Sequence, residues 1–307
     1  MTGTTHQQAD VEGVAGGVGL TALLVAAARA IETHRPDSLA RDAYAEHFVR
    51  AAPACAHWPG RIEDVPDGDD DPLWGRFARY FGLRTRVLDD FLLTSVRTGP
   101  RQVVLLGAGL DTRALRLDWP AGCSVFEVDR ASVLAFKQHV LTHLSPTRNL
   151  STTPKATRVL VPVDLRADWV GALTTAGFDP GAPSVWLAEG LLFYLPASAE
   201  SHLIDTVDGL TTGGSALAFE VKLEKDLLAY RDSPIYTATR EQTGIDLLHL
   251  FDREPRPDSA GTLAARGWST STHTPFDFTR RHGRGPLPEP NDALEGNRWV
   301  FAHKPRP

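Results

Sequence analysis

The sequence predicts an α/β protein with a mainly parallel sheet, and two segments in register support this prediction. An apolar run of β-forming residues over 102–106 ends in the turn Gly107-Ala-Gly109, and a helix-like segment follows. A second apolar run, 123–128, ends in Asp129, which lies about twenty residues after the turn, where a ribose-binding carboxylate is expected. Together they indicate the first half of a nucleotide-binding βαβ unit.

Composition is that of an ordinary globular protein and excludes several function classes. The chain has 307 residues, 42% hydrophobic and 23% charged, which allows one large core or two domains. The chain has 32 basic and 38 acidic residues, and its sequence shows no cluster of Lys and Arg that could bind a phosphate backbone. Nucleic acid is therefore not expected as a partner. Cys55 and Cys123 suggest no disulfide framework. With no signal peptide or membrane span in the sequence, we expect a cytoplasmic protein that does not bind membranes.

The N-terminal part is predicted to be helical. Residues 1–12 are polar and expected to be flexible. A helix is predicted from Leu20, and Pro36 ends it. Ser38 belongs to a new N-cap, from which a second helix is predicted to run to about Val49.

A loop and one long helix are predicted to complete the helical part, 13–98. Residues 59–71 are rich in Pro, Gly and acids and are predicted to form the loop. Asp71 is expected to cap the long helix, with Pro72 at its first position, and the helix to reach about Val96.

Seven strands are predicted after the helical part. Those expected to be parallel and buried are continuous apolar or mostly apolar runs, at 102–106, 123–128, 157–163, 184–188 and 215–221. The segments 268–273 and 298–303 alternate polar and apolar residues, which is typical of half-exposed antiparallel strands. This is the outline of a class I methyltransferase sheet. We expect one domain over 13–307, with a cofactor-binding core at 99–221, an inserted helical cap at 222–258 and antiparallel strands within 259–307.

Arg84 interrupts the apolar stripe of the long helix. It lies four residues after Tyr80 and four before Leu88, at positions that share one helix face. A buried guanidinium needs an anionic partner, which is either an internal Asp or Glu or the carboxylate of a cofactor.

The glycine turn favours a cofactor without phosphate, although Gly107 and Gly109 could also form a plain tight turn. A dinucleotide fingerprint requires Gly or Ala where this chain has Thr112, and Asp111 would repel a pyrophosphate. S-adenosylmethionine carries a sulfonium and an ammonium group, so it suits this turn better than NAD. A Tyr-x-x-x-Lys pattern, which an NAD-linked oxidoreductase would use, is also missing downstream.

Two further acids follow predicted strands and are therefore expected at the ligand-binding edge of the sheet. Asp164 could accept a hydrogen bond from an adenine amino group beside the Leu165 backbone, or cap a helix over 165–176, or do both. Glu189 could hold the cofactor's ammonium or lie beneath its sulfonium. Tyr194 and Phe193 are candidates for an apolar wall around the methyl group, or simply for the core.

Other chemistries have little support. His139 and His143 have a zinc-compatible spacing, but no third ligand completes a site, so no metal is expected. The sequence contains no Gly-x-Ser-x-Gly elbow and no P-loop, which argues against hydrolases and NTPases.

Six motifs in order resemble the leucine carboxyl methyltransferase family. They are GVGLTALLVAAARA at 17–30, LRTR at 83–86, LLGAGLDTRA at 105–114, FEVD at 126–129, PVDL at 162–165 and EGLLFYL at 189–195. The chain is most similar to the bacterial branch of S-adenosylmethionine-dependent enzymes from mycobacteria and actinomycetes, and to polyketide carboxyl methyltransferases. The resemblance extends over roughly 13–304.

The resemblance implies a role for each candidate residue. Asp129 would bind the ribose, and Asp164 with Leu165 the adenine. The glycines would approach the methionine moiety, and Glu189 would line its amino-acid end. Arg84, or Arg86 as the alternative, would pair with its carboxylate. The N-terminal helices and the cap would close over the acceptor.

The predicted activity is O-methylation of a carboxylate on a small metabolite or a peptide C-terminus. A carboxylate is already ionised at neutral pH and needs no general base. A phenol or alcohol acceptor would need one, for which Tyr194, His202 or His249 are the candidates. A non-catalytic cofactor-binding regulator stays open as the alternative outside enzymology, and the oligomeric state is left open.

Overall fold

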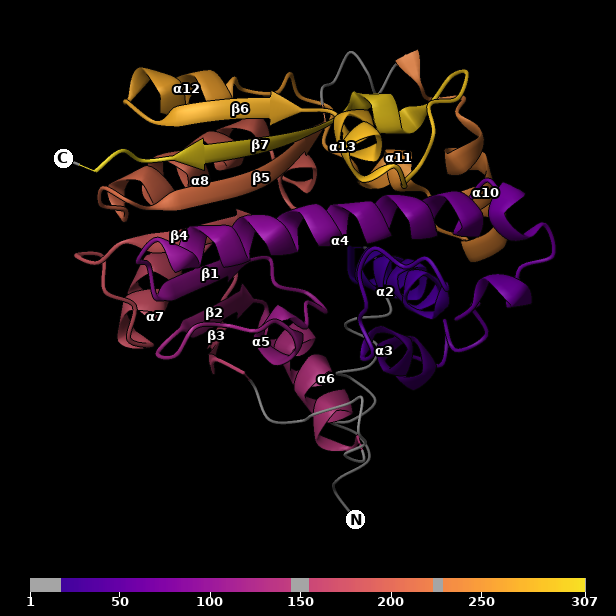
Figure 1. Cartoon of the computed structure of the whole chain (residues 1–307), viewed down its shortest axis with the longest axis horizontal. Helices are drawn as coiled ribbons and strands as arrows, with labels where there is room; N and C mark the ends of the chain where they lie inside the picture. Colours follow the sequence, from indigo (N-terminus) through magenta and orange to yellow (C-terminus); the bar gives the residue numbers. More distant parts are fainter. Residues whose placement is uncertain (1–17, 145–154, 223–228, 307) are drawn as a thin grey trace.

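A computed structural model describes residues 18–144, 155–222 and 229–306 (Figure 1). In this part of the chain, seven strands form one sheet with the order β3-β2-β1-β4-β5-β7-β6. The strands β1 to β5 are parallel, and β7 runs antiparallel to both β5 and β6. The predicted mainly parallel α/β sheet is therefore confirmed. The predicted flexible segment, 1–12, lies outside the described residues.

The strand bounds agree with the sequence predictions to within one residue at each end. They are Gln102–Leu106 for β1, Ser124–Asp129 for β2, Thr157–Pro162 for β3, Ser184–Ala188 for β4, Ala216–Lys222 for β5, Ser269–His273 for β6 and Asn297–His303 for β7. The strands β1, β2 and β3 follow one another towards one edge of the sheet, whereas β4 and β5 follow one another towards the other edge. The point between β1 and β4 is therefore a topological switch point, at the carboxyl edge of the central strands.

Helices cover both faces of the sheet because its central strands are apolar on both sides. Val103 and Leu105 of β1 share a hydrophobic cluster with α4 (Trp74–Arg97), whereas Val104 and Leu106 face the opposite cluster. That second cluster includes α7 (Trp169–Thr175), α8 (Ala197–Gly209) and α12 (Ser259–Ala265). The alternation follows from the two-residue period of a strand.

The remaining helices surround the carboxyl end of the sheet. In Figure 1, α4 crosses the molecule, with α2 and α3 beside its N-terminal half and α10, α11 and α13 near the same end. The bounds are Val18–His34 for α2, Ala45–Ala51 for α3, Arg113–Arg116 for α5, Ala131–Thr142 for α6, Pro234–Thr243 for α10, Leu247–Leu250 for α11 and Pro275–His282 for α13. The helices α10 and α11 belong to the predicted cap, whose residues 223–228 lie outside the described part.

The second N-terminal helix begins later than predicted. Ser38 starts no helix, and α3 begins at Ala45. The backbone between them is bonded to side chains of α2 instead: Leu39 N donates to Glu32 Oε1 at 2.7 Å and Asp42 N to Thr33 Oγ1 at 2.8 Å. These bonds satisfy the local amides without a helix.

The long helix also starts later than predicted, at Trp74. Pro72 is therefore not its first residue. Asp71 still stabilises the N-terminus of the helix, because its Oδ1 accepts hydrogen bonds from Leu73 N at 2.9 Å and Trp74 N at 2.5 Å. No described helix is both long enough and apolar enough to cross a membrane.

Glu32 at the α2–α4 contact makes the stability of this fold depend on pH. Burial raises the pKa of Glu32 to about 7, although the bond from Leu39 N and the charge of Arg35 oppose this. Because the folded-state pKa exceeds the ordinary value of 4.5, protonation favours the folded state. The stability that this group contributes is fully present below pH 4.5 and is lost as pH rises through 7.

We expect Glu32→Gln, which stays neutral, to become progressively more stable than wild type as pH rises. Between pH 4 and 8 the difference in unfolding free energy should grow by about 3 kcal/mol in favour of the variant, as measured by urea unfolding. Glu63→Gln, at an exposed glutamate, serves as the control and should show no such trend. If the difference in unfolding free energy between Glu32→Gln and wild type stayed constant from pH 4 to 8, the prediction would be contradicted.

Candidate active site

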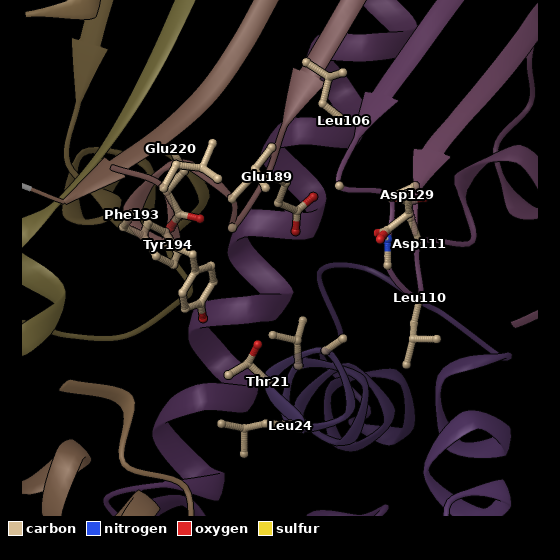
Figure 2. Close-up of a pocket in the computed structure, with 18 of the residues that line it drawn as sticks. Thr21, Leu24, Leu106, Leu110, Asp111, Asp129, Glu189, Phe193, Tyr194 and Glu220 are labelled. Atoms are coloured by element: carbon tan, nitrogen blue, oxygen red, sulfur yellow. The ribbon is translucent and has the colours of Figure 1, made fainter. Parts of the chain in front are cut away.

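A cavity of about 550 Å³ lies at the carboxyl edge of the parallel strands. Its walls come from α2, α4, the segments after β1 to β4, the end of β5, the cap helices α10 and α11, and the segment 293–297. All eight predicted site residues line it, namely Arg84, Gly107, Gly109, Asp129, Asp164, Leu165, Glu189 and Tyr194. In Figure 2, Glu189 lies between Asp129 on one side and Tyr194 with Glu220 on the other.

The glycine turn needs glycine for steric reasons. Gly107 has φ of 62° and Gly109 has φ of 45°, in the left-handed region that side chains disfavour. A Cβ on Gly107 would also lie 3.0 Å from a methyl carbon of Leu191. The turn therefore leaves its backbone close to the cavity with no side chain in the way.

Asp111 bonds back onto the chain after this turn. Its carboxylate accepts a hydrogen bond from Arg113 N at 2.7 Å and pairs with the Arg113 guanidinium. Burial would raise its pKa, but the charges of Arg113, Lys137 and Arg116 together outweigh this and lower the pKa to about 2. Asp111 is thus an ionised, neutralised carboxylate, so its charge repels an anionic ligand less than the sequence alone indicates.

Asp129 ends β2 and is bonded to the glycine turn. Its Oδ2 accepts from Gly109 N and its Oδ1 from Arg130 N, both at 2.7 Å. Burial raises the pKa of Asp129, and the two backbone bonds offset part of the rise. A carboxylate oxygen can accept more than one hydrogen bond, so both oxygens of Asp129 keep capacity for a ligand diol.

Asp164 is not a helix cap, so that alternative is wrong. The helix α7 begins at Trp169, and Asp168 caps it by accepting from Gly171 N at 2.9 Å. Asp164 instead pairs with the exposed Arg166 at 2.6 Å, which lowers the pKa of Asp164 to about 2. The carboxylate is therefore ionised at the rim of the cavity, next to Leu165.

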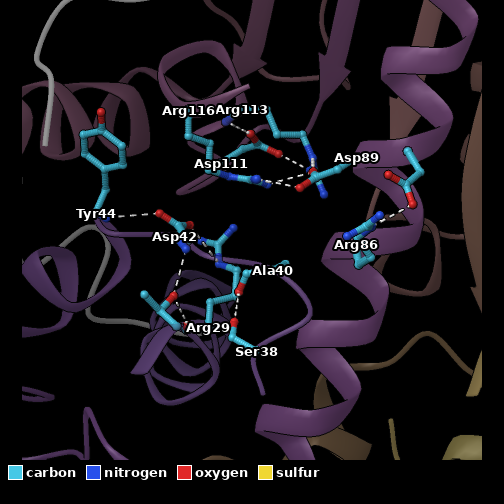
Figure 3. Close-up of polar contacts among 12 residues, drawn as sticks. Arg29, Ser38, Ala40, Asp42, Tyr44, Arg86, Asp89, Asp111, Arg113 and Arg116 are labelled. Carbon is cyan, nitrogen blue, oxygen red and sulfur yellow. Dashed lines mark hydrogen bonds and ion pairs between the residues drawn. The ribbon is translucent and has the colours of Figure 1, made fainter. Parts of the chain in front are cut away.

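Arg84 is paired with two internal acids, while Arg86 lies outside the cavity lining. The Arg84 guanidinium contacts Glu189 at 2.9 Å and Glu220 at 2.7 Å, and burial leaves only 4% of the residue exposed. Its Nε is buried with no hydrogen-bond partner in the described structure. Arg86 forms an exposed pair with Asp90 at 2.8 Å, separate from the Arg113 cluster in Figure 3.

Arg113 is a buried cation beside the cavity residue Glu189 that the sequence analysis did not single out. It is 1% exposed and contacts Glu189 and Asp89, both at 2.7 Å, as well as Asp111. Burial alone would raise the pKa of Glu189, but Arg113 and then Arg84 lower it overall. The sequence itself could have pointed to Arg113, because it is a charged residue inside the motif 105–114.

Glu220 is the other residue that was missed. It lies within β5, where it accepts hydrogen bonds from the Tyr80 hydroxyl and from Trp299 Nε1, the latter at 3.2 Å. A lone acid in a strand buried along its whole length requires a partner such as Arg84. That requirement could have identified Glu220 from the sequence.

Tyr194 forms the wall of the cavity opposite Asp129 (Figure 2). Burial raises the pKa of its phenol to about 12, while a hydrogen bond with Thr21 opposes the rise. Its ring lies 4.7 Å from Phe193 and 5.7 Å from Phe251 between centroids. At neutral pH the hydroxyl is protonated and can donate a hydrogen bond.

The histidines of the sequence analysis lie outside this site. The rings of His139 and His143 are 4.3 Å apart, but within the described ranges no three His, Cys, Asp or Glu side chains form a group that could hold a metal. His202 and His249 are exposed, and neither belongs to the described cavity lining.

Comparison with known proteins assigns the family. The profile of the leucine carboxyl methyltransferases matches residues 22–208. The chain belongs to the leucine carboxyl methyltransferase family. It is 69% identical, over 100% of both chains, to a Streptomyces coelicolor protein provisionally named an S-adenosyl-L-methionine-dependent methyltransferase. A Rhodococcus jostii protein with the same kind of name is 42% identical over 90% of this chain and 91% of its own.

Solved structures support the fold of this family member. A DUF574 family protein from Streptomyces avermitilis superposes with a TM-score of 0.52 at 13% identity, covering 90% of this chain and 100% of its own. A provisionally named methyltransferase from Thermobifida fusca gives 0.50 at 16% identity, with 91% and 94% covered. The family and the class of enzyme, a methyltransferase, are thus as predicted.

The buried Arg113 cluster should be important for stability. Arg113→Met would leave three buried carboxylates without their shared cation, and we expect a loss of about 3–5 kcal/mol in unfolding free energy by urea titration. Arg86→Met, which breaks an exposed ion pair with Asp90 on α4, should cost less than about 1 kcal/mol. Equal, small losses in both variants would contradict this assignment.

Proposed function

We propose that this protein is an O-methyltransferase for a carboxylate on a small secondary metabolite or a peptide C-terminus. The methyl donor is S-adenosyl-L-methionine, the cofactor that the names of its relatives carry. When bound, this cofactor supplies a methyl group activated by a sulfonium. The protein must orient the acceptor towards that carbon and exclude water from the cavity.

The cavity residues fit this cofactor. The open backbone of Gly107 and Gly109 allows close approach, and Asp129 retains hydrogen-bonding capacity for a ribose diol. Asp164 and the Leu165 backbone lie at the rim, where an adenine would be held. These features support the assignment of Asp129, Asp164 and Leu165 to the nucleoside part of the donor, and of the two glycines to its methionine part.

Arg84 and Glu189 suit the amino-acid end of the donor. The unpartnered Nε of Arg84 is a buried donor for a carboxylate. Glu189 is ionised and held between two arginines, so it can accept hydrogen bonds from an ammonium while the arginines fix its position. Glu189 acts in this proposal as a binding group, because its lowered pKa makes it a poor base.

The choice of a carboxylate acceptor depends on one observation: the described residues that line the cavity offer no suitable base. Among the described lining residues there is no histidine or cysteine. Glu189 and Glu220 are both paired with Arg84, and the phenol of Tyr194 has a pKa of about 12. A carboxylate nucleophile is already ionised, whereas a phenol or alcohol would need a base near neutrality. Tyr194 then serves as an aromatic wall and hydrogen-bond donor.

The role of Arg84 can be separated from that of Arg86 by calorimetry. Arg84→Lys keeps the charge but loses the guanidinium donors, so affinity for S-adenosylmethionine should fall roughly 10- to 100-fold. Affinity for decarboxylated S-adenosylmethionine should be almost unchanged, since that ligand lacks the carboxylate. Arg86→Lys is the matched control and should bind both ligands like wild type. A parallel loss for both ligands in Arg84→Lys would show that Arg84 does not meet the carboxylate.

The acceptor class is tested by transfer of labelled methyl groups to a panel of carboxylates, a leucine-ended peptide and phenols. We expect methyl esters, with kcat nearly independent of pH between about 6 and 8.5, because the carboxylate ionises well below this range. Methylated phenols with a rate that rises with pH would favour hydroxyl transfer instead. Cofactor binding without transfer to any acceptor would favour a non-catalytic regulator.

A further inference from the structure

Tyr236 on α10 is a buried side chain with an unused hydrogen-bonding group. It lines the cavity, is 7% exposed, and its hydroxyl has no hydrogen-bond partner in the described structure. Buried polar groups without partners are rare because they lose their bonds to water and gain none in return. A buried, unpartnered hydroxyl on a residue that lines a ligand cavity indicates a bond that forms when the ligand is present.

The surroundings of Tyr236 are aromatic. Phe251 lies next to it, with ring centroids 6.3 Å apart, and Phe251 also contacts Tyr194 at 5.7 Å and Phe193 at 5.3 Å. All four side chains line the same cavity. This end of the cavity therefore suits the apolar body of a ligand, which would lose little by leaving water.

A cation lies beside the same phenol. The ammonium of Lys222 is 5.8 Å from the centroid of the Tyr236 ring, and its hydrogen bonds at 2.5 and 2.9 Å go to Ala293 O and Asn297 Oδ1. Burial, with Tyr194 and Asp292 nearby, raises the pKa of Tyr236, so its hydroxyl is protonated and acts as a donor. A donor and a cation beside an apolar chamber favour an anion with an apolar body.

We propose that Tyr236 binds the acceptor, by donating a hydrogen bond to one oxygen of its carboxylate, and that the acceptor is a small apolar monocarboxylic acid. This proposal rests on the function proposed above. The bond from Tyr236 would hold one oxygen so that the other points towards the methyl donor. The ring of Phe251 and its aromatic neighbours would contact the aryl or alkyl body.

The other charged groups of the cavity support an anionic acceptor. Glu189 and Glu220 are the acids between the two ends of the cavity, and Arg84 contacts both. They therefore create no unpaired negative charge that would attract a cationic acceptor or repel a carboxylate strongly. Tyr194 has a hydrogen bond with Thr21, which leaves Tyr236 as the phenol with an unsatisfied donor among the described residues of the aromatic chamber.

The test compares Tyr236→Phe with wild type, using phenylacetate and octanoate as acceptors and labelled S-adenosylmethionine as donor. We expect kcat/KM for both acids to fall about 10-fold or more in the variant, while its affinity for S-adenosylhomocysteine stays unchanged. Phenylacetamide, which lacks the charge, should inhibit both proteins equally weakly. Tyr230→Phe removes a hydroxyl outside the described cavity lining and should behave like wild type.

Thermal stability gives a second readout of the role of Tyr236. A purely structural role of its hydroxyl would lower the unfolding midpoint of Tyr236→Phe, whereas a ligand-binding role would not. Because the Tyr236 hydroxyl is unsatisfied in the free protein, the thermal unfolding midpoint of Tyr236→Phe should equal or exceed that of wild type. A lower midpoint would mean that the hydroxyl is bonded within the protein, and would overturn the proposal.

The outcomes separate this inference from the proposed function. Methyl esters formed equally well by wild type and Tyr236→Phe would overturn the role of Tyr236 and leave carboxyl transfer standing. Ester formation on the leucine-ended peptide but not on the two small acids would overturn the claim that the acceptor is a small apolar acid. It would leave carboxyl transfer standing. If wild type esterifies no carboxylate although it binds the donor, both the inference and the proposed function fail.

Discussion

The carboxylate of Glu189 is held between two buried arginines, and the arrangement of the site depends on this double ion pair. Arg84 extends from α4 and Arg113 from the start of α5, so the pair joins three separate elements at the edge of the sheet. Charges buried in a medium of low polarity are tolerated only when they are matched. The position of α4 across the sheet is therefore tied to the position of the residues after β4.

This constraint also divides the cavity into two chemically different ends. On one side, Asp129 and Asp164 present ionisable oxygens next to the glycine turn. On the other, aromatic rings from the segment after β4 and from the cap enclose a chamber of low polarity. The paired charges lie between these ends, where the reacting groups of donor and acceptor would meet. A site of this form can bind a polar nucleoside at one end and an apolar acid at the other, because the charged groups between the two ends are paired with one another.

Much of this arrangement could be predicted from the sequence, for reasons that differ between elements. The central strands were predicted well because burial on both faces requires continuous apolar runs, and Asp129 because it follows one of them. The start of α3 was wrong because side chains of α2 bind the backbone of 35–44, a tertiary effect that no local pattern reveals. Tyr236 could not be found because its significance depends on a missing partner, which only the packed structure can reveal.

The antiparallel strand β7 carries a consequence for how the protein is made. Asn297 and Trp299, at its start, donate hydrogen bonds to Tyr80 and Glu220 at the floor of the cavity. In chain order these residues follow the other described residues that line the pocket, so they are synthesised after them. A nascent or prematurely terminated chain would thus carry β5 as an uncovered sheet edge, open to pairing with other polypeptides. The strand β7 therefore both completes the described cavity and covers the edge of β5.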